Sequence, residues 1–294
     1  MDKQSLINKT MDLDDLRSDE ALKIIDELNS FIEELRAKNV RTSSWYGKFD
    51  LTGNPNSREW LNRGYNYKSL AGASDDRNVP WFLYWEIVWV VLNAEFRPGQ
   101  RVLDLGGSSS LFSYYLASKD LEVTTIDLQK ELVDNANHVA AQMGWRLKNH
   151  VMDMRELRSE TKYDCITSIC VYEHIPMYDR VVVNRKIKEC LVDGGRFNVT
   201  FDYRNPSRRA RIGSPQDVYR QFVEPSGLKV RGNEQFFDNG ESYLLHPFYH
   251  RRISWVYKVG CVARGDFAPR ELFSRKDGND YTFGALFLEN TERP

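Results

Sequence analysis

The stretch that most constrains the fold is RVLDLGGSSSLFSYYLASKDLEVTTIDLQ, residues 101–129. It begins as an apolar strand, continues through two glycines and three serines into a short helix, and ends as a second strand closed by Asp127. A strand, a helix and a second strand in close succession indicate a parallel pair joined by a crossover helix. In such a sheet, ligands bind beyond the carboxyl ends of the strands.

The same alternation continues along the chain. It predicts further strands near 147–152, 163–170, 195–201, 228–236 and 281–289, and helices near 110–118, 130–143, 179–192, 215–226 and 248–259. This order favours an α/β fold with a doubly wound, mostly parallel, seven-stranded Rossmann-like sheet and helices on both faces. The helix that starts at Pro80 is apolar on nearly all sides, which predicts burial between layers.

Two domains are expected, an N-terminal helix and cap or lid over residues 1–79 and the sheet domain over residues 80–294. From Ser18 to Lys38, apolar residues recur at helical spacing, and Ser18 is suited to be the N-cap. We interpret the apolar stripe as packing on its own domain, and a homodimer through this stripe is the alternative. The aromatic residues of the cap are expected to pack in the core for the most part, or to close over a ligand as a lid.

Composition narrows the class of partner. The chain has 41 basic and 42 acidic residues, so overall charge provides no attraction to nucleic acid or to a membrane. The four cysteines lack the paired spacing of zinc sites, so no metal is expected and the thiols are expected to be reduced. The sequence shows neither the apolar stretch of a signal peptide nor a membrane span, which predicts a cytoplasmic location.

The residues that follow each strand form the candidate site. Gly106 and Gly107 allow a ligand to approach the backbone at a helix N-terminus, where free N–H groups favour a negative group. Asp127 ends the second strand, where a carboxylate can accept hydrogen bonds from two ribose hydroxyls. Both features also suit a dinucleotide, but the row from Gly106 to Ser110 lacks the GxGxxG pattern that a pyrophosphate needs.

The segment from Asp104 to Ser110 has an acid two positions before its first glycine. It resembles motif I of the class I S-adenosylmethionine-dependent methyltransferases. The resemblance covers roughly residues 80–290. Within this range, residues 173–175 are similar to the EHI form of motif IV. The stretch LVDGGRFNVTFDY, residues 191–203, is similar to the family's LKPGG turn and the strand that follows it. It implies S-adenosylmethionine as the cofactor. It also implies cofactor contacts for ten residues, namely Asp104, Gly106, Gly107, Ser108, Ser110, Asp127, Leu128, Asp153, Met154 and Ser168.

The resemblance implies a part of the cofactor for several of these residues. The glycines would line the methionine part, Asp127 would bind the ribose, and Leu128 would flank the adenine. Asp153 would accept a hydrogen bond from the adenine amino group. Ser108 and Ser110 stand where many family members have glycines, so we expect altered contacts with retained binding.

The implied function is methyl transfer to a small-molecule acceptor. A hydroxyl acceptor must lose a proton, and the candidate catalytic residues are His174, His250 and Asp202, although His174 also suits a structural role beside Glu173. Because candidate bases are present, oxygen is slightly favoured over nitrogen as the acceptor atom.

Arginines in two loops suggest an anionic acceptor. Arg208, Arg209 and Arg251 are the candidate substrate-binding residues, because guanidinium groups bind phosphate or carboxylate with paired hydrogen bonds. A solvated loop whose arginines pair with surface acids is the alternative. Two further functions stay open: a non-catalytic methyltransferase-like binding protein, and a nucleotide-dependent oxidoreductase, which the absent GxGxxG disfavours.

Overall fold

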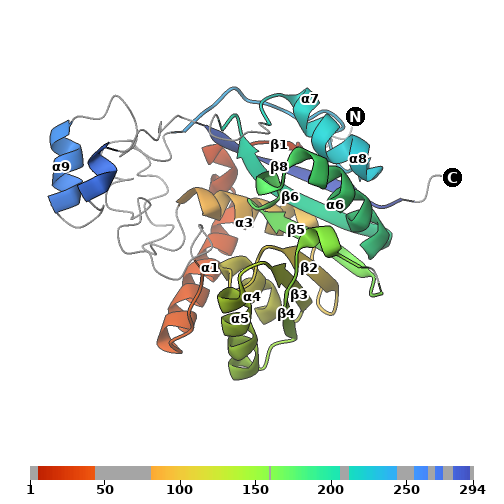
Figure 1. Cartoon of the computed structure of the whole chain (residues 1–294), viewed down its shortest axis with the longest axis horizontal. Coiled ribbons are helices and arrows are strands. Elements are labelled where there is room, and N and C mark those ends of the chain that lie inside the picture. The colour runs from red at the N-terminus through yellow and green to blue at the C-terminus, as the bar shows by residue number, and fades with distance from the viewer. Residues whose placement is uncertain are drawn as a thin grey trace.

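The computed structural model describes residues 6–43, 81–158, 160–205, 212–243, 255–263, 269–273 and 281–291. Over these ranges the chain forms an α/β fold around one eight-stranded sheet (Figure 1). The strands are mostly parallel and helices cover both faces of the sheet, so the predicted fold class is confirmed.

Five parallel strands form most of the sheet and reach one of its edges. From β2 (Arg101–Leu105) the chain adds β3 (Glu122–Asp127) and then β4 (Leu147–Val151) on one side. It then crosses to the other side of β2, where β5 (Tyr163–Ile169) and β6 (Leu191–Tyr203) follow. The winding therefore reverses between β2 and β5, and such a reversal leaves a crevice for a ligand at the carboxyl ends of the strands.

Antiparallel strands extend the sheet beyond β6. There β8 (Thr282–Glu289) pairs with β6, and the two-residue strands β1 (Lys9–Thr10) and β7 (Lys229–Val230) pair with β8. Asn8 holds β1 in place, because its Oδ1 accepts a hydrogen bond from the backbone N–H of Phe287 at 2.8 Å. The N-terminal segment thus adds an eighth strand, while β7 is shorter than the strand predicted over 228–236.

The helices form two layers (Figure 1). On one side of the sheet lie α1 (Asp19–Ala37), α3 (Trp81–Ala94), α4 (Leu111–Ser118) and α5 (Lys130–Met143). On the other side lie α6 (Met177–Cys190) and a continuous run of α7 (Pro215–Val218), the π-helical turn η5 (Tyr219–Val223) and α8 (Glu224–Ser226).

The remaining described helices are η1 (Leu13–Arg17), η3 (Met154–Glu156), η4 (Tyr172–His174), α9 (Trp255–Ala263) and η7 (Pro269–Phe273). Helix α9 overlaps the end of the helix predicted near 248–259, whose first part is outside the described residues. Among the described helices, none has the length and apolar character needed to cross a bilayer.

Alternate residues of each strand face opposite helix layers. Val102 packs with the α3 and α4 layer, and Leu103 packs with the α6 layer. Helix α1 begins after the Ser18 cap and buries its apolar stripe against α3 and α4 of the same chain. Its Phe31 contacts Tyr115 of α4, with ring centroids 6.1 Å apart. This contact supports the interpretation that the stripe packs on its own chain.

A row of polar side chains crosses the α3 and α4 face of the sheet. Asn149, Thr125, Asp104, Thr167 and Asn198 occupy paired positions on β4, β3, β2, β5 and β6, and all five are buried. The Thr125 hydroxyl donates to Asn149 Oδ1 at 2.6 Å, and the Thr167 hydroxyl donates to Asp104 Oδ1 at 2.9 Å. A shift in strand register would break these bonds and leave buried polar groups unpaired, which is costly.

Trp85 of α3 generates a stability prediction. Its ring is fully buried and stacks on Trp89, and its indole N–H donates to Asp15 Oδ2 at 2.8 Å. Trp85→Ala is expected to lower the free energy of unfolding by about 3–5 kcal/mol, measured by urea denaturation. The control is Leu22→Ala on the exposed face of α1, which should change it by less than about 0.5 kcal/mol. Equal effects of the two substitutions would contradict the assigned packing.

Candidate functional site

A cavity of about 710 Å³ lies at the carboxyl ends of the parallel strands, where the winding of the sheet reverses. Its walls include most of the side chains that the sequence singled out at strand ends. These are Asp104, Gly106, Gly107, Ser110, Asp127, Leu128, Asp153, Met154 and His174. Residues from four successive loops therefore meet around one space.

Other predicted residues lie away from this wall. Ser108 is buried, and its hydroxyl forms a 2.6 Å hydrogen bond with the Thr125 hydroxyl in the polar row. Ser168 is buried too, and its Oγ has no hydrogen-bond partner among the described residues. Asp202 is buried behind the wall. The remaining predicted residues, His250, Arg208, Arg209 and Arg251, lie outside the described residues.

The two glycines are required by close contacts. Gly106 has φ +79°, and a Cβ atom added there would lie 2.5 Å from Cγ1 of Val171. A Cβ atom on Gly107 would lie 1.7 Å from Oδ2 of Asp104. Both distances are far shorter than a van der Waals contact, so any other residue would displace the wall of the cavity.

The turn after the glycines presents the N-terminus of α4 to the cavity. Ser110 is the N-cap of this helix, and its hydroxyl accepts from the backbone N–H of Ser113 at 3.1 Å. Leu111 and Phe112, which also line the cavity, begin the first helical turn. The positive end of the helix dipole therefore faces the cavity and favours a negatively charged group there.

Burial changes the acidity of the two carboxyl groups at the ends of β2 and β3. Burial raises the pKa of Asp104 to about 7, while the hydrogen bond from Thr167 lowers it and the nearby charge of Asp127 raises it. Burial also raises the pKa of Asp127, opposed by backbone N–H groups that include Gln129, which donates to Oδ1 at 2.9 Å.

Asp153 is held differently, because it is paired with an arginine. Nε of Arg155 donates to both of its carboxylate oxygens, at 3.0 and 2.9 Å, and Nη2 donates to Oδ2 at 2.6 Å. These hydrogen bonds lower the pKa of Asp153. Nη1 of Arg155 also reaches Asp179 at 3.3 Å. Asp153, which was predicted to accept a hydrogen bond from the adenine amino group, therefore already accepts hydrogen bonds from Arg155.

His174 lies on the cavity wall in the short helix η4, directly after β5. Arg180, which is buried on α6, donates hydrogen bonds to the carbonyl oxygens of the flanking residues Glu173 and Ile175, the latter at 2.9 Å. Arg180 therefore holds the loop that carries His174. No pattern in the sequence singles out Arg180, because composition does not distinguish a buried arginine from one on the surface.

The cavity also has walls that the strand-end pattern did not predict. Leu83 and Ile87 contribute from α3, which was predicted to be buried without being assigned to the site. Ser43, in the described segment after α1, lines the cavity, and its backbone N–H donates to the carbonyl of Ser109 at 2.7 Å. Neither contact follows a periodic pattern along the sequence, so only the packing of the chain reveals it.

Known proteins resemble this chain in sequence and in fold. A family model for a methyltransferase domain matches residues 102–195. The ubiquinone biosynthesis O-methyltransferase of Xanthomonas axonopodis pv. citri (strain 306) is 30% identical over 189 residues, covering 58% of this chain and 78% of that protein. The protein of the same name from Aeromonas salmonicida (strain A449) is 34% identical over 110 residues, 37% of this chain and 45% of that protein.

One solved structure supports the fold alone. It is a Galdieria sulphuraria protein assigned as a sarcosine dimethylglycine methyltransferase, which aligns with a TM-score of 0.51 at 14% sequence identity. The alignment covers 70% of this chain and 84% of that protein.

The buried carboxyl group of Asp104 generates a prediction about pH. Its folded pKa near 7 lies above its ordinary value of 3.8, so between these values the folded state retains a proton that the unfolded chain releases. Its contribution to stability should therefore fall as the pH rises through this window, by about 1.4 kcal/mol for each pH unit. Asp104→Asn, which keeps an acceptor for Thr167, should remove that slope.

The measurement is urea denaturation of both proteins at several pH values across the window. Asp134→Asn, which changes an exposed acid on α5, is the matched control and should keep the slope of the unchanged protein. Parallel pH profiles for the Asp104→Asn variant and the unchanged protein would show that this carboxyl group does not titrate there.

Proposed function

Because the chain belongs to the class I S-adenosylmethionine-dependent methyltransferase superfamily, we propose that it methylates an oxygen atom of a small-molecule acceptor. The protein is an enzyme whose cofactor is S-adenosylmethionine. The choice of oxygen is supported by the relatives, which are named O-methyltransferases, and by the presence of a histidine on the cavity wall. The observation that carries the proposal is one cavity bounded by the glycine turn, Asp127 and His174.

The glycine turn suits the methionine part of the cofactor. Side chains are excluded at Gly106 and Gly107, so a ligand can contact the backbone there, and the N-terminus of α4 favours a carboxylate. The bound cofactor supplies an electrophilic methyl group on its sulfonium sulfur. Alignment of that methyl group with the acceptor atom is the main task of the protein, since the reaction is an in-line displacement.

The cavity residues that follow β3 and β4 suit the nucleoside. Asp127, at the carboxyl end of β3, is assigned to the ribose hydroxyls, and the exposed Leu128 beside it to one side of the adenine. Met154, beyond β4, is assigned to the ring as well. In this assignment Asp153 accepts from the adenine amino group while it keeps its ion pair with Arg155, since a carboxylate has about four acceptor positions.

His174 is assigned as the base that removes the proton of an acceptor hydroxyl. Its place on the wall of the cavity supports this role, because a base must reach the acceptor within hydrogen-bond distance. Asp202 is not part of that wall, which makes it the weaker candidate. Apolar side chains such as Leu83 and Ile87 line the same cavity and would exclude water from the reaction.

An anionic acceptor is a further part of the proposal, and it rests on the sequence. Arg208, Arg209 and Arg251 lie in two arginine-containing loops whose guanidinium groups suit phosphate or carboxylate. His250, the third candidate base, is next to Arg251 in the sequence. These residues are outside the described ranges.

The ribose assignment predicts the effect of Asp127→Asn on cofactor binding. Loss of the carboxylate that accepts from the ribose should weaken binding of S-adenosylhomocysteine by about 1–3 kcal/mol, measured by isothermal titration calorimetry. Asp134→Asn, on the exposed face of α5, is the control and should bind like the unchanged protein. Unchanged affinity in the Asp127→Asn variant would remove the assignment.

The assignment of the base predicts the effect of His174→Gln. With a hydroxylated acceptor found by screening, kcat should fall by about 10²–10⁴-fold, while the affinity for S-adenosylhomocysteine stays the same. The screen should include amine analogues of each acceptor. Transfer to amines alone, or full activity of the variant, would contradict O-methylation with this base.

A further inference from the structure

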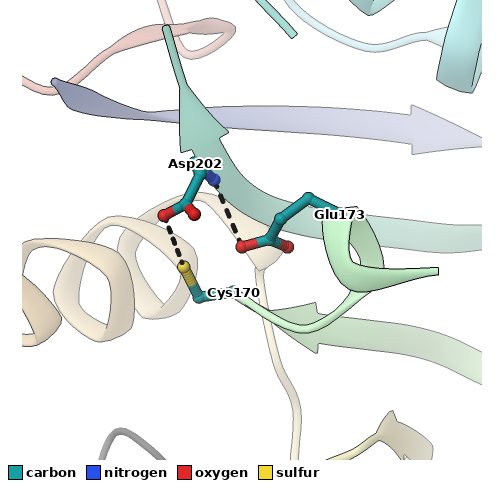
Figure 2. Close-up of side chains that lie close together, drawn as sticks. All are labelled: Cys170, Glu173 and Asp202. Atoms are coloured by element: carbon teal, nitrogen blue, oxygen red, sulfur yellow. Dashed lines mark hydrogen bonds between the residues drawn. The ribbon is translucent and has the colours of Figure 1, made fainter. Parts of the chain in front are cut away.

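Three side chains that commonly bind metal ions lie close together (Figure 2), and one of them, Cys170, lines the cavity. Cys170 directly follows β5, Glu173 belongs to η4, and Asp202 lies near the end of β6. One ligand atom from each lies within 4.8 Å of the other two. The exposed fractions of the three residues are 8%, 4% and 1%, so the cluster is inside the protein.

The three groups are already oriented toward one another. The Cys170 thiol donates to Oδ1 of Asp202 at 3.6 Å, and Oε1 of Glu173 accepts from the backbone N–H of Asp202 at 3.3 Å (Figure 2). Cys170 has φ +53°, an uncommon backbone conformation for a residue other than glycine. Its backbone N–H donates to the hydroxyl of Thr200 at 3.1 Å, which holds this conformation.

A fourth group, Glu86 of α3, extends the cluster. It is fully buried, and its Oε1 accepts from the same Thr200 hydroxyl at 2.8 Å. The second carboxylate oxygen, Oε2, is buried and has no hydrogen-bond partner among the described residues. A buried carboxylate oxygen without a donor is costly, so this atom indicates that a cation or a proton belongs beside it.

The charges around the cluster have the same sign. Burial raises the pKa of Glu86 well above its ordinary value, and the charges of Glu173 and Asp202 raise it further. Burial likewise raises the pKa of the Cys170 thiol, and the same carboxylates add to the effect. A positive ion placed among buried acids of this kind would favour their charged forms.

Arg180 of α6 binds the backbone of the loop that follows β5. Arg180 donates through its guanidinium to the backbone carbonyl oxygens of Glu173 and Ile175 and to Oε1 of Gln221. These bonds hold the loop that carries Cys170 and Glu173 against α6.

We propose that Cys170, Glu173 and Asp202 bind a divalent metal ion, with Glu86 as the adjoining carboxylate. A thiolate with two carboxylates suits Zn²⁺ better than Mg²⁺, because sulfur is a soft ligand and Mg²⁺ takes oxygen ligands. The thiol releases its proton to solvent when the metal–sulfur bond forms, so binding weakens as the pH falls. Cys170 also lines the cavity, which provides a path for the ion to enter and a position open to a further ligand.

This proposal departs from the expectation that no metal would bind. That expectation considered only the spacing of cysteines. The proposed ligands are of three residue types, and the parallel pairing of β5 with β6 brings residues 170 and 202 together. The contact between Cys170 and Asp202 joins residues far apart in the sequence, so the spacing of the cysteines does not predict it.

The test uses the full chain stripped with a chelator and then titrated with Co²⁺ as a spectroscopic substitute for Zn²⁺. We expect thiolate-to-cobalt charge-transfer absorption that saturates at about one ion per chain. Zn²⁺ should abolish this absorption by competition, whereas excess Mg²⁺ should leave it unchanged. The signal should also diminish at lower pH. Absence of the charge-transfer absorption, or its displacement by Mg²⁺, would overturn the proposal without any variant.

Variants then identify the ligands. Cys170→Ser should eliminate the charge-transfer absorption, and Asp202→Asn should weaken Zn²⁺ binding by at least about tenfold. Cys190→Ser, which changes a buried thiol of the α6 core, is the matched control and should keep both signals. Circular dichroism and S-adenosylhomocysteine binding check that each variant folds. Absorption that persists in Cys170→Ser and disappears in Cys190→Ser would assign the metal to another site and overturn the proposal.

Discussion

The arrangement of the site depends on the hydrogen bonds of a polar row that crosses the sheet beneath it. Thr167 of β5 donates to Asp104 of β2, and Thr125 of β3 bonds to both Asn149 of β4 and Ser108 of the glycine turn. These bonds form in one strand register only, since a shift by one residue would turn each side chain to the opposite face. They therefore fix the positions of the loops whose residues line the cavity.

The same face of β6 continues the polar row toward α3. Thr200 and Asp202 alternate with the apolar residues Phe201 and Tyr203, which face the α6 layer. Glu86 reaches this row from α3, a mostly apolar helix. Carboxyl groups placed so deeply weaken the fold unless they are hydrogen-bonded or neutralised. The presence of Glu86, Glu173 and Asp202 in this buried position is the physical basis for the proposed metal site.

Much of the architecture could be predicted because its signals are local. The helix over 130–143 and the strands over 101–105 and 122–127 follow from periodicity and turn residues, and Ser18 acts as the predicted cap. Strand β1 could not be predicted in this way, because its two residues have no period and depend on partners of Asn8 far along the chain. The direction of the Ser108 hydroxyl, toward Thr125, likewise depends on a neighbouring strand.

The sequence by itself determined which residues end the strands, and parallel strands bring such residues to one edge of the sheet. The sequence therefore predicts that Gly106, Asp127 and Asp153 lie close together, and all three line one cavity. Only the tertiary structure decided how each side chain is satisfied: Asp153 by Arg155, Asp104 by Thr167, and Cys170 beside Asp202. The physical reason is that hydrogen bonding, burial and charge act through space, between residues whose separation along the chain carries no regular pattern.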